Sequence, residues 1–287
     1  IVSHDMETYY EAASIRELEY DGNLDLLKAA LRALELPGGL YISVRCDAPP
    51  GSGTGSSASV GVALLGLLDR LRSTLAGDRR HNMSRFEIAE MACRLESELG
   101  IIGGKQDQYA AAVGGFNYME FYDDQVVVEP LELHSWVRLE LHKHILLCYS
   151  GQSRLSGDTN QRMISAYAAG DPTVTEALRQ VKRVAQDMRR ALIGGDLQWF
   201  AELLEEEWDA RSRLAPGVVT PRMQELREAG KRAGALATKV CGAGGGGCLL
   251  FYCAEDSEAA VARALEAAGG RILDFNFDFS GLEVWQS

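Results

Sequence analysis

The residues with the clearest chemical potential form a glycine-rich stretch that runs from Ala48 to Ser59. Three alternating glycines, Gly51, Gly53 and Gly55, follow a Pro-Pro pair and precede two serines. Glycine lets a backbone turn tightly and approach a ligand closely. A helix that begins at the serines would point unpaired N–H groups and its positive dipole end at this loop. Such a junction favours phosphate binding, although an ordinary loop with a serine cap would use the same residues.

Two common phosphate motifs do not fit this stretch. A Walker A loop needs a lysine after the last glycine, and none follows here. A Rossmann pattern read from Gly51 fails at Ser56, and one read from Gly53 ends at the tolerated variant Ala58. Because no strand ending in an acidic residue follows at the required distance, we set a dinucleotide site aside.

Two carboxylates and a second glycine cluster are further candidates. Glu96 lies beside the apolar stripe of a predicted helix, either at its edge or in a cleft. Asp107 precedes small helix-forming residues, so it is an N-cap, a reactive carboxylate or both. The cluster from Gly242 to Gly247 has more glycines than a tight turn needs, and each glycine has an entropic cost.

The elements that must position these residues alternate without a simple βαβ order. Apolar periodicity and capping residues predict helices over residues 24–34, 60–71, 85–99, 172–192, 197–208, 221–229 and 259–265. Alternation and buried runs predict strands over residues 40–44, 116–121, 126–131, 144–149, 248–252 and 271–277. We expect Asn23 to cap the first helix and Ser84 to open a capping box.

Composition limits the class of protein. The 287 residues, 46% of them hydrophobic, suffice for two lobes with buried cores. The net charge of −12 argues against a nucleic-acid or anionic-membrane partner, but not against a nucleotide that arrives with Mg²⁺. The 6 cysteines form no Cys-x-x-Cys pair, which indicates reduced thiols in a cytoplasmic protein. We recognise no membrane span and no signal peptide.

Taken together, the motifs resemble those of the GHMP kinases, the superfamily of galactokinase, homoserine kinase, mevalonate kinase and phosphomevalonate kinase. Pro49 to Ala58 is similar to the superfamily's central motif, with Thr54 where leucine is usual. The stretches from Lys239 to Gly247 and from Gly104 to Gln108 are similar to its C-terminal glycine motif and to the segment that carries the catalytic Asp. Glu96 precedes Asp107 by 11 residues, the spacing of the Mg²⁺-binding Glu in mevalonate kinase.

Within the superfamily, the stretches from Gly103 to Tyr118 and from Gly151 to Asp158 are most similar to bacterial D-glycero-D-manno-heptose 7-phosphate kinases. The resemblance covers the chain from about residue 40 onward. Family members open with a strand and a Gly-Gly-Gly-Thr-Asp turn that helps to hold the sugar. This sequence begins Ile1-Val2-Ser3 without such a turn, so we expect either that an N-terminal segment is missing from it or that this protein has lost the segment.

The resemblance implies a two-lobed α+β fold with the site in the cleft between the lobes. The N-terminal ATP-binding lobe, expected over residues 1–136, would resemble the second domain of ribosomal protein S5. The C-terminal lobe, expected over residues 137–287, would be ferredoxin-like.

The resemblance also assigns a role to each candidate residue. Ten residues would bind ATP: Pro50, Gly51, Gly53, Gly55, Ser56, Ser57, Ala58, Gly242, Gly244 and Gly245. Ser57 and Glu96 would bind Mg²⁺, and their alternatives are a helix cap and a solvated carboxylate. Asp107 would contact the substrate and act as the catalytic base or as an electrostatic positioner.

Three further residues would serve the sugar side or the transferring group. Lys105, also expected to be catalytic, would hold a phosphate, or would simply pair with a carboxylate. Gly151 and Arg154 lie in a polar loop at a strand end and would contact the substrate. The guanidinium fork of Arg154 suits a sugar phosphate, and a surface ion pair is its alternative.

The implied activity is transfer of the γ-phosphoryl group of ATP to a hydroxyl of a sugar or sugar phosphate. The foremost acceptor is the anomeric hydroxyl of D-glycero-D-manno-heptose 7-phosphate. The alternatives are a fucose or galactose 1-kinase, a mevalonate-type kinase, or a catalytically silent relative, and the presence of both Asp107 and Glu96 argues against the last. The expected partners are ATP, Mg²⁺, a small sugar and a second copy of the chain in a homodimer.

Overall fold

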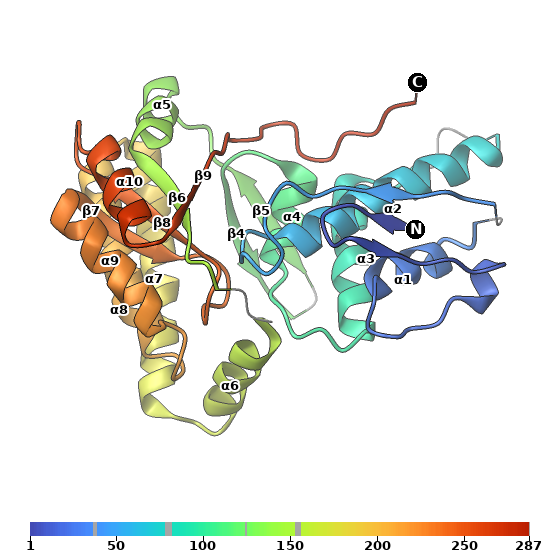
Figure 1. The fold of residues 1–287 in the computed structure, drawn as a ribbon, viewed down its shortest axis with the longest axis horizontal. Coiled ribbons are helices and arrows are strands. Elements are labelled where there is room, and N and C mark those ends of the chain that lie inside the picture. Colours follow the sequence, from blue (N-terminus) through green and yellow to red (C-terminus); the bar gives the residue numbers. More distant parts are fainter. Residues whose placement is uncertain (37–38, 78–81, 124, 153–155, 287) are drawn as a thin grey trace. The chain divides into compact units, whose positions relative to one another are not determined.

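The computed structural model describes residues 1–36, 39–77, 82–123, 125–152 and 156–286, which fold into two compact units (Figure 1). The first unit comprises Ile1–Pro50, Gly55–Val128 and the segment that begins at Asp278. The second comprises Gly51–Thr54 and Glu129–Phe277. The expected division into two lobes is therefore observed. The lobe boundary expected after residue 136 stays a prediction.

Four α-helices among the described residues contribute apolar side chains to the core of the first unit. In the second of them, Leu64, Leu65 and Leu68 are each at most 4% exposed, as their helical spacing requires. This helix begins at Ser56, ahead of the stripe predicted from residue 60, so both serines of the glycine-rich stretch lie in its first turn. The helices of this unit are α1 (Asp25–Ala33), α2 (Ser56–Leu75), α3 (Arg85–Glu98) and α4 (Gln106–Val113), with a 3₁₀ turn η1 (Ile15–Glu17).

Local chemistry explains where α3 begins, but not where α1 does. The predicted capping box is confirmed, because the Ser84 side chain accepts from the N–H of Glu87 and the Glu87 carboxylate accepts from the N–H of Ser84. The prediction that Asn23 caps α1 was wrong. Leu24 is the N-cap residue, with a left-handed φ of 54° and no side-chain cap. Instead, the Asp25 carboxylate accepts from the preceding turn.

The strands of the first unit are short. β1 pairs antiparallel with β2 and parallel with β3, and the strand predicted over residues 40–44 is reduced to its last two positions. The hairpin predicted after residue 116 is confirmed as β4 and β5, while Asp124 of its expected turn lies outside the described residues. The strands are β1 (Val2–Ser3), β2 (Thr8–Tyr9), β3 (Ser43–Val44), β4 (Asn117–Phe121) and β5 (Val126–Pro130), whose last two residues belong to the second unit.

The C-terminal segment returns to the first unit, which the sequence did not predict. The N–H of Leu282 donates to the carbonyl of Ala112 in α4 at 3.1 Å, and the N–H of Gly115 donates to Asp278 at 2.7 Å. A Cβ at Gly66 of α2 would lie 2.7 Å from the Leu282 side chain. Glycine at this position therefore lets the returning segment pack directly on α2.

The second unit is built on a four-stranded antiparallel sheet with the order β7-β8-β6-β9. In chain order this places the third strand beside the first, with the second and fourth at the edges, as in a ferredoxin-like fold. The strands are β6 (Ile145–Tyr149), β7 (Ala235–Val240), β8 (Cys248–Cys253) and β9 (Arg271–Leu273). The helices are α5 (Ser135–His144), α6 (Ser156–Ala168), α7 (Pro172–Gly194), α8 (Leu197–Ser212), α9 (Pro221–Ala233) and α10 (Glu258–Ala267).

One apolar core joins this sheet to three of the helices. Trp208 of α8, Leu226 of α9 and Leu265 of α10 pack in one cluster with Leu249 and Phe251 of the central strand β8. Both β8 side chains are fully buried, which explains the continuous apolar run that predicted the strand.

Capping residues predicted two helix starts correctly, whereas elements with weak patterns were missed. Asp171 accepts from the first turn of α7, and Thr220 caps α9. The sequence did not predict α5, α6 or β7. Two alanines alternate on the buried side of β7, and alanine is not typical of strands. The strand predicted from His144 begins one residue later because His144 ends α5.

Candidate active site

The start of α2 brings the first glycine-rich stretch next to Asp107. Gly55 is the N-cap residue of α2, with a left-handed φ of 74° that glycine adopts without strain. A Cβ at Gly55 would lie 3.3 Å from the Cβ of Asp107. The alternative that Asp107 caps α4 was wrong, because Lys105 is the N-cap residue and Asp107 lies in the first turn. Its carboxylate is thus placed where the dipole of α2 favours negative charge.

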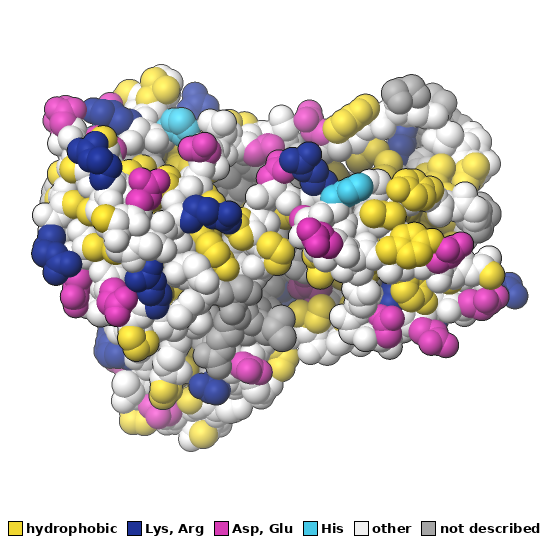
Figure 2. Space-filling model, in the orientation of Figure 1, with side chains coloured by type: hydrophobic (Ala, Val, Ile, Leu, Met, Phe, Trp, Pro, Cys, Tyr) yellow, Lys and Arg dark blue, Asp and Glu magenta, His cyan; other side chains and the backbone are white. Residues whose placement is uncertain are grey.

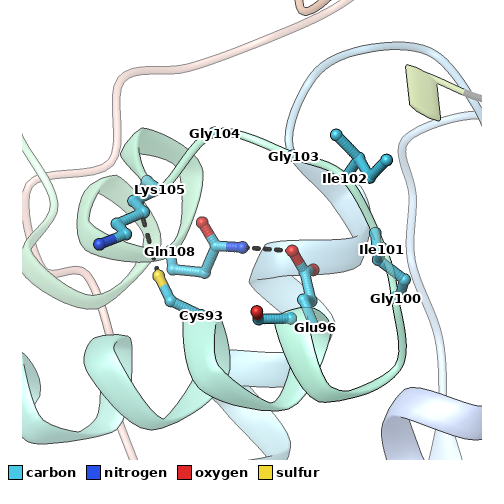
Figure 3. Close-up of a pocket in the computed structure, with 10 residues that line it drawn as sticks. Cys93, Glu96, Gly100, Ile101, Ile102, Gly103, Gly104, Lys105 and Gln108 are labelled. Carbon is cyan, nitrogen blue, oxygen red and sulfur yellow. Dashed lines mark hydrogen bonds between the residues drawn. The ribbon is translucent and has the colours of Figure 1, made fainter. Parts of the chain in front are cut away.

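Glu96 of α3 reaches the same helix start from another side. It is only 9% exposed, so the alternative of a solvated carboxylate was wrong. The hydroxyl of Ser57 donates to Oε1 at 3.5 Å. Nε2 of Gln108 donates to Oε2 at 2.7 Å (Figure 3). Ser57 is not a helix cap, since Gly55 holds that position. Three helices therefore converge on one carboxylate.

Both Glu96 and Asp107 have raised pKa values. Burial raises the pKa of Glu96, the hydrogen bond from Ser57 opposes this, and the nearby charge of Asp107 adds to it. Burial also raises the pKa of Asp107, against a hydrogen bond from Gln106. Among the described residues, no Lys or Arg pairs with Glu96. A cation supplied from outside the chain would relieve both shifts.

A cavity of about 300 Å³ opens beside Glu96 and Gln108, bounded by the loop from Gly100 to Lys105. Lys105 itself is exposed, and Figure 3 shows its ammonium group pointing away from Glu96. Cys93 also lines the cavity, and burial raises the pKa of its thiol to about 11. The thiol therefore stays protonated near neutral pH and is a poor nucleophile.

In the second unit, Gly51–Thr54 packs directly on the second glycine cluster. The N–H of Cys248 donates to the carbonyl of Ser52 at 2.7 Å. A Cβ at Gly53 would lie 2.7 Å from the carbonyl oxygen of Cys241, and one at Gly247 would lie 2.4 Å from that of Ser52. Side chains at these positions would force the two backbones apart, so the contact alone explains both glycines.

The remaining glycines of the cluster and of the polar loop are also tied together. A Cβ at Gly242 would lie 3.0 Å from Gly53, and one at Gly244 would lie 2.4 Å from the carbonyl of Val218. The N–H of Gly245 already donates to that same carbonyl, at 2.8 Å. Gly151 is exposed and open on its Cβ side. Arg154 lies outside the described residues.

Sequence reasoning missed a buried ionic cluster behind the second glycine cluster. Glu207 of α8 is 4% exposed, and its Oε1 accepts from Arg211 and, at 3.1 Å, from Lys239 of β7. Arg211 also donates to the carbonyl of Gly242 at 3.1 Å. Burial opposes ionisation of Glu207, but the two cations outweigh it and lower its pKa. The sequence feature that could have revealed this cluster is a glutamate next to Trp208, on the apolar side of α8.

The surface shown in Figure 2 carries charged side chains of both signs. On the face shown in Figure 2, Lys and Arg side chains are interspersed with Asp and Glu rather than gathered into one basic patch. Within the described ranges, no helix is both long and apolar enough to cross a membrane.

Comparisons with known proteins match both parts of the chain. Residues 24–115 match the GHMP kinases N terminal domain, and residues 188–271 match the GHMP kinases C terminal domain. The chain is 30% identical over 291 residues to the D-glycero-alpha-D-manno-heptose 7-phosphate kinase of Campylobacter jejuni, covering 99% of this chain and 83% of that one. It is 29% identical to the mevalonate kinase of Pyrococcus horikoshii, covering 99% and 84%.

A solved structure gives the same result. The crystal structure of a D-glycero-D-manno-heptose 1-phosphate kinase from Bacteroides thetaiotaomicron aligns with a TM-score of 0.76 and 30% identity, covering 99% of this chain and 82% of that one. The chain therefore belongs to the GHMP kinase family, and the prediction of an ATP-dependent sugar kinase that phosphorylates a hydroxyl group is confirmed.

Proposed function

We propose that this kinase transfers the γ-phosphoryl group of ATP to the anomeric hydroxyl of a heptose 7-phosphate, forming the 1,7-bisphosphate. The observation that carries the proposal is the placement of Asp107 and Glu96 at the N-terminus of α2, in a chain 30% identical to a heptose 7-phosphate kinase. The product would supply nucleotide-activated heptose for surface polysaccharide. We place the reaction in the cytoplasm, where ATP is available.

The nucleotide phosphates would be bound by backbone groups. The first turn of α2 lies at the positive end of a 20-residue helix, which favours the triphosphate. Ser56 and the exposed Ser57 lie in this turn, whereas the buried Ala58 supports it from within. The proposed nucleotide-binding residues are Pro50, Gly51, Gly53, Gly55, Ser56, Ser57, Ala58, Gly242, Gly244 and Gly245.

Ser57 and Glu96 fit a Mg²⁺ ion. Mg²⁺ takes oxygen ligands, keeps several waters and binds proteins through one or two side chains plus substrate phosphates. The buried Glu96 lacks a cationic partner among the described residues, and the hydroxyl of Ser57 lies 3.5 Å from its Oε1. When bound, the ion would neutralise charge on the phosphates of ATP.

Asp107 would act on the acceptor hydroxyl. Its carboxylate would take the proton as the anomeric oxygen bonds to the γ-phosphorus and the bond to ADP breaks. Burial raises the pKa of Asp107, which makes it a better proton acceptor than an exposed aspartate. In a loose transition state the same carboxylate would orient the hydroxyl.

The sugar side would be completed by Lys105, Gly151 and Arg154. Lys105 is exposed at the start of α4, two residues before Asp107, and a flexible ammonium group there could contact a phosphate. Gly151 lies in the loop that Gln152 ties to Gly247 at 2.7 Å. Self-association into a homodimer belongs to the proposal and is tested by the mass in solution.

One family alternative has specific support. The 29% identity to an archaeal mevalonate kinase over nearly the whole chain makes mevalonate a second candidate acceptor. The two candidates differ in chemistry, because a heptose 7-phosphate carries a phosphate for Lys105 or Arg154, whereas mevalonate carries a carboxylate.

The test is a substrate panel. The purified protein is incubated with Mg-ATP and heptose 7-phosphate, heptose, fucose, galactose or mevalonate, and ADP release is measured. We expect the highest kcat/KM with heptose 7-phosphate, and a new anomeric phosphate signal by ³¹P NMR. Preference for mevalonate would favour the alternative, and no turnover on any acceptor would reject a sugar kinase of this range.

A further inference from the structure

Gln108 has a polar side chain in a position where polar groups are costly. It lies on α4 directly after Asp107, and it is only 2% exposed. Its Nε2 donates to Oε2 of Glu96 at 2.7 Å, whereas its Oε1 is buried and has no partner among the described residues. A buried amide with one end unpaired loses free energy that an apolar side chain would keep. A role in orienting Glu96 would explain why an amide occupies this position.

The two hydrogen bonds on Glu96 are unequal. The donor on Oε2 is buried and close, while the donor on Oε1 is the exposed hydroxyl of Ser57 at 3.5 Å. Figure 3 shows the Gln108 amide directed at the carboxylate from the side of the cavity. A close hydrogen bond from a buried donor restricts the rotation of the carboxylate, so it favours one direction for the other oxygen. Oε1 therefore lies next to Ser57 and can still accept a further contact.

We propose that Gln108 is a positioning residue that orients Glu96 for a divalent cation shared with Ser57. The inference rests on the proposed function, which assigns Mg²⁺ to these two side chains. Consecutive residues of α4 then serve different ends of the reaction, since Asp107 lies against Gly55 while Gln108 holds Glu96. Outer partners that orient a ligand commonly change metal affinity about 10-fold to 100-fold when removed.

A double-mutant cycle tests this role. Mn²⁺ binding is measured by electron paramagnetic resonance in the presence of the non-hydrolysable ATP analogue AMP-PNP, for the wild type, Gln108→Met, Glu96→Gln and the double variant. We expect Gln108→Met to weaken Mn²⁺ binding about 10-fold in the wild-type background and to have no further effect beside Glu96→Gln. In steady-state assays, Gln108→Met should need a higher Mg²⁺ concentration for half-maximal rate. Its kcat should be largely restored at saturating Mg²⁺.

Two further variants serve as controls for the effect of Gln108→Met. Ser97→Ala changes a neighbour of Glu96 on the same cavity wall and should bind Mn²⁺ within twofold of the wild type. Gln108→Asn keeps a buried amide but is one methylene too short for the 2.7 Å contact, so it should reproduce the effect of Gln108→Met if the latter folds poorly. Thermal unfolding is recorded for each variant.

The outcomes separate the two levels of the proposal. Wild-type Mn²⁺ affinity in folded Gln108→Met and Gln108→Asn, or an equal loss in both backgrounds, would overturn the positioning role and leave the kinase assignment intact. Unchanged Mn²⁺ affinity in Glu96→Gln would overturn the metal assignment and the positioning role together.

Discussion

Two buried glutamates, one in each unit, lie in opposite electrostatic surroundings. Glu207 is 4% exposed and is paired with both Arg211 and Lys239, so its pKa is lowered in spite of burial. Glu96 is 9% exposed and, among the described residues, receives hydrogen bonds from Ser57 and Gln108 but pairs with no Lys or Arg, so burial raises its pKa. Similar burial therefore produces shifts of opposite sign, because within the part of the chain that the structure describes cations pair with Glu207 and not with Glu96.

We interpret this difference as one between a structural carboxylate, Glu207, and a carboxylate proposed to be functional, Glu96. A buried charge that the chain neutralises itself supports the local structure, and Glu207 holds Arg211 against the carbonyl of Gly242. A buried charge left without a cation is costly unless a ligand supplies one, and perturbed groups of this kind gather at functional sites. The four predictions below test this distinction, in order of decreasing effect.

Asp107→Asn should have the largest effect, and on turnover alone. Removing a proton acceptor commonly lowers a rate by about 10²–10⁴-fold, so kcat should fall by this order. ATP affinity and the melting temperature should change little, since Asn is nearly the same size. Steady-state kinetics with the best acceptor and calorimetric titration of ATP measure the two effects. An unchanged kcat would remove Asp107 from the mechanism.

Glu96→Gln should weaken metal binding without unfolding the protein. The amide lacks the charge that attracts Mg²⁺, so the Mg²⁺ concentration for half-maximal rate should rise by more than about 10-fold. Because the substitution removes a buried charge with no cationic partner among the described residues, stability should stay constant or rise slightly. Mg²⁺ titrations and urea unfolding without nucleotide provide the measurements. A large loss of stability would show that Glu96 is a structural carboxylate like Glu207.

Glu207→Gln should do the reverse, with lower stability and little direct effect on metal binding. The substitution leaves Arg211 and Lys239 without a counter-charge. Breaking a fully buried pair costs about 3–5 kcal/mol, and the partial exposure of both cations reduces our expectation to roughly 2 kcal/mol. The free energy of unfolding in urea measures this loss. Stability equal to the wild type would contradict a structural role.

The smallest effect should be a pH dependence that Glu207 adds to stability. Its folded pKa lies below the ordinary value of 4.5, so below that value the unfolded chain binds more protons than the folded one. The stabilisation is complete above pH 4.5 and is lost as the pH falls through the folded pKa. Unfolding between pH 3 and pH 7 should therefore show a shallower acid-side loss in Glu207→Gln. Identical slopes in both proteins would contradict the lowered pKa.

Much of the local structure could be predicted because its causes lie within a few residues. The capping box at Ser84 and the start of α7 at Asp171 depend on side chains that bond to backbone groups three residues away or less. The apolar run of β8 reflects burial on both sides. Elements without such a local signal, such as the alanine-containing β7, were missed. Their formation depends on contacts with residues that are distant in the sequence.

The motifs also predicted which residues to examine, but not all of their surroundings. Asp107 and Glu96 were singled out by their place in the sequence, yet Gln108, which holds Glu96, was passed over. Gly53 was predicted to bind ATP, and the structure adds that Gly53 and Gly247 let two backbones touch. Close backbone contacts between segments nearly two hundred residues apart leave no local pattern.

The sequence by itself determined the family, the glycine-rich phosphate motif and the identity of the two carboxylates, because each depends on residue type and spacing. The tertiary structure alone decided that Glu207 is paired with cations while Glu96 pairs with none among the described residues, and that the C-terminal segment packs on α2 and α4. The physical reason is that the energy between charges depends on their distance and on the water excluded around them. Both quantities are set only when segments remote in the chain pack together.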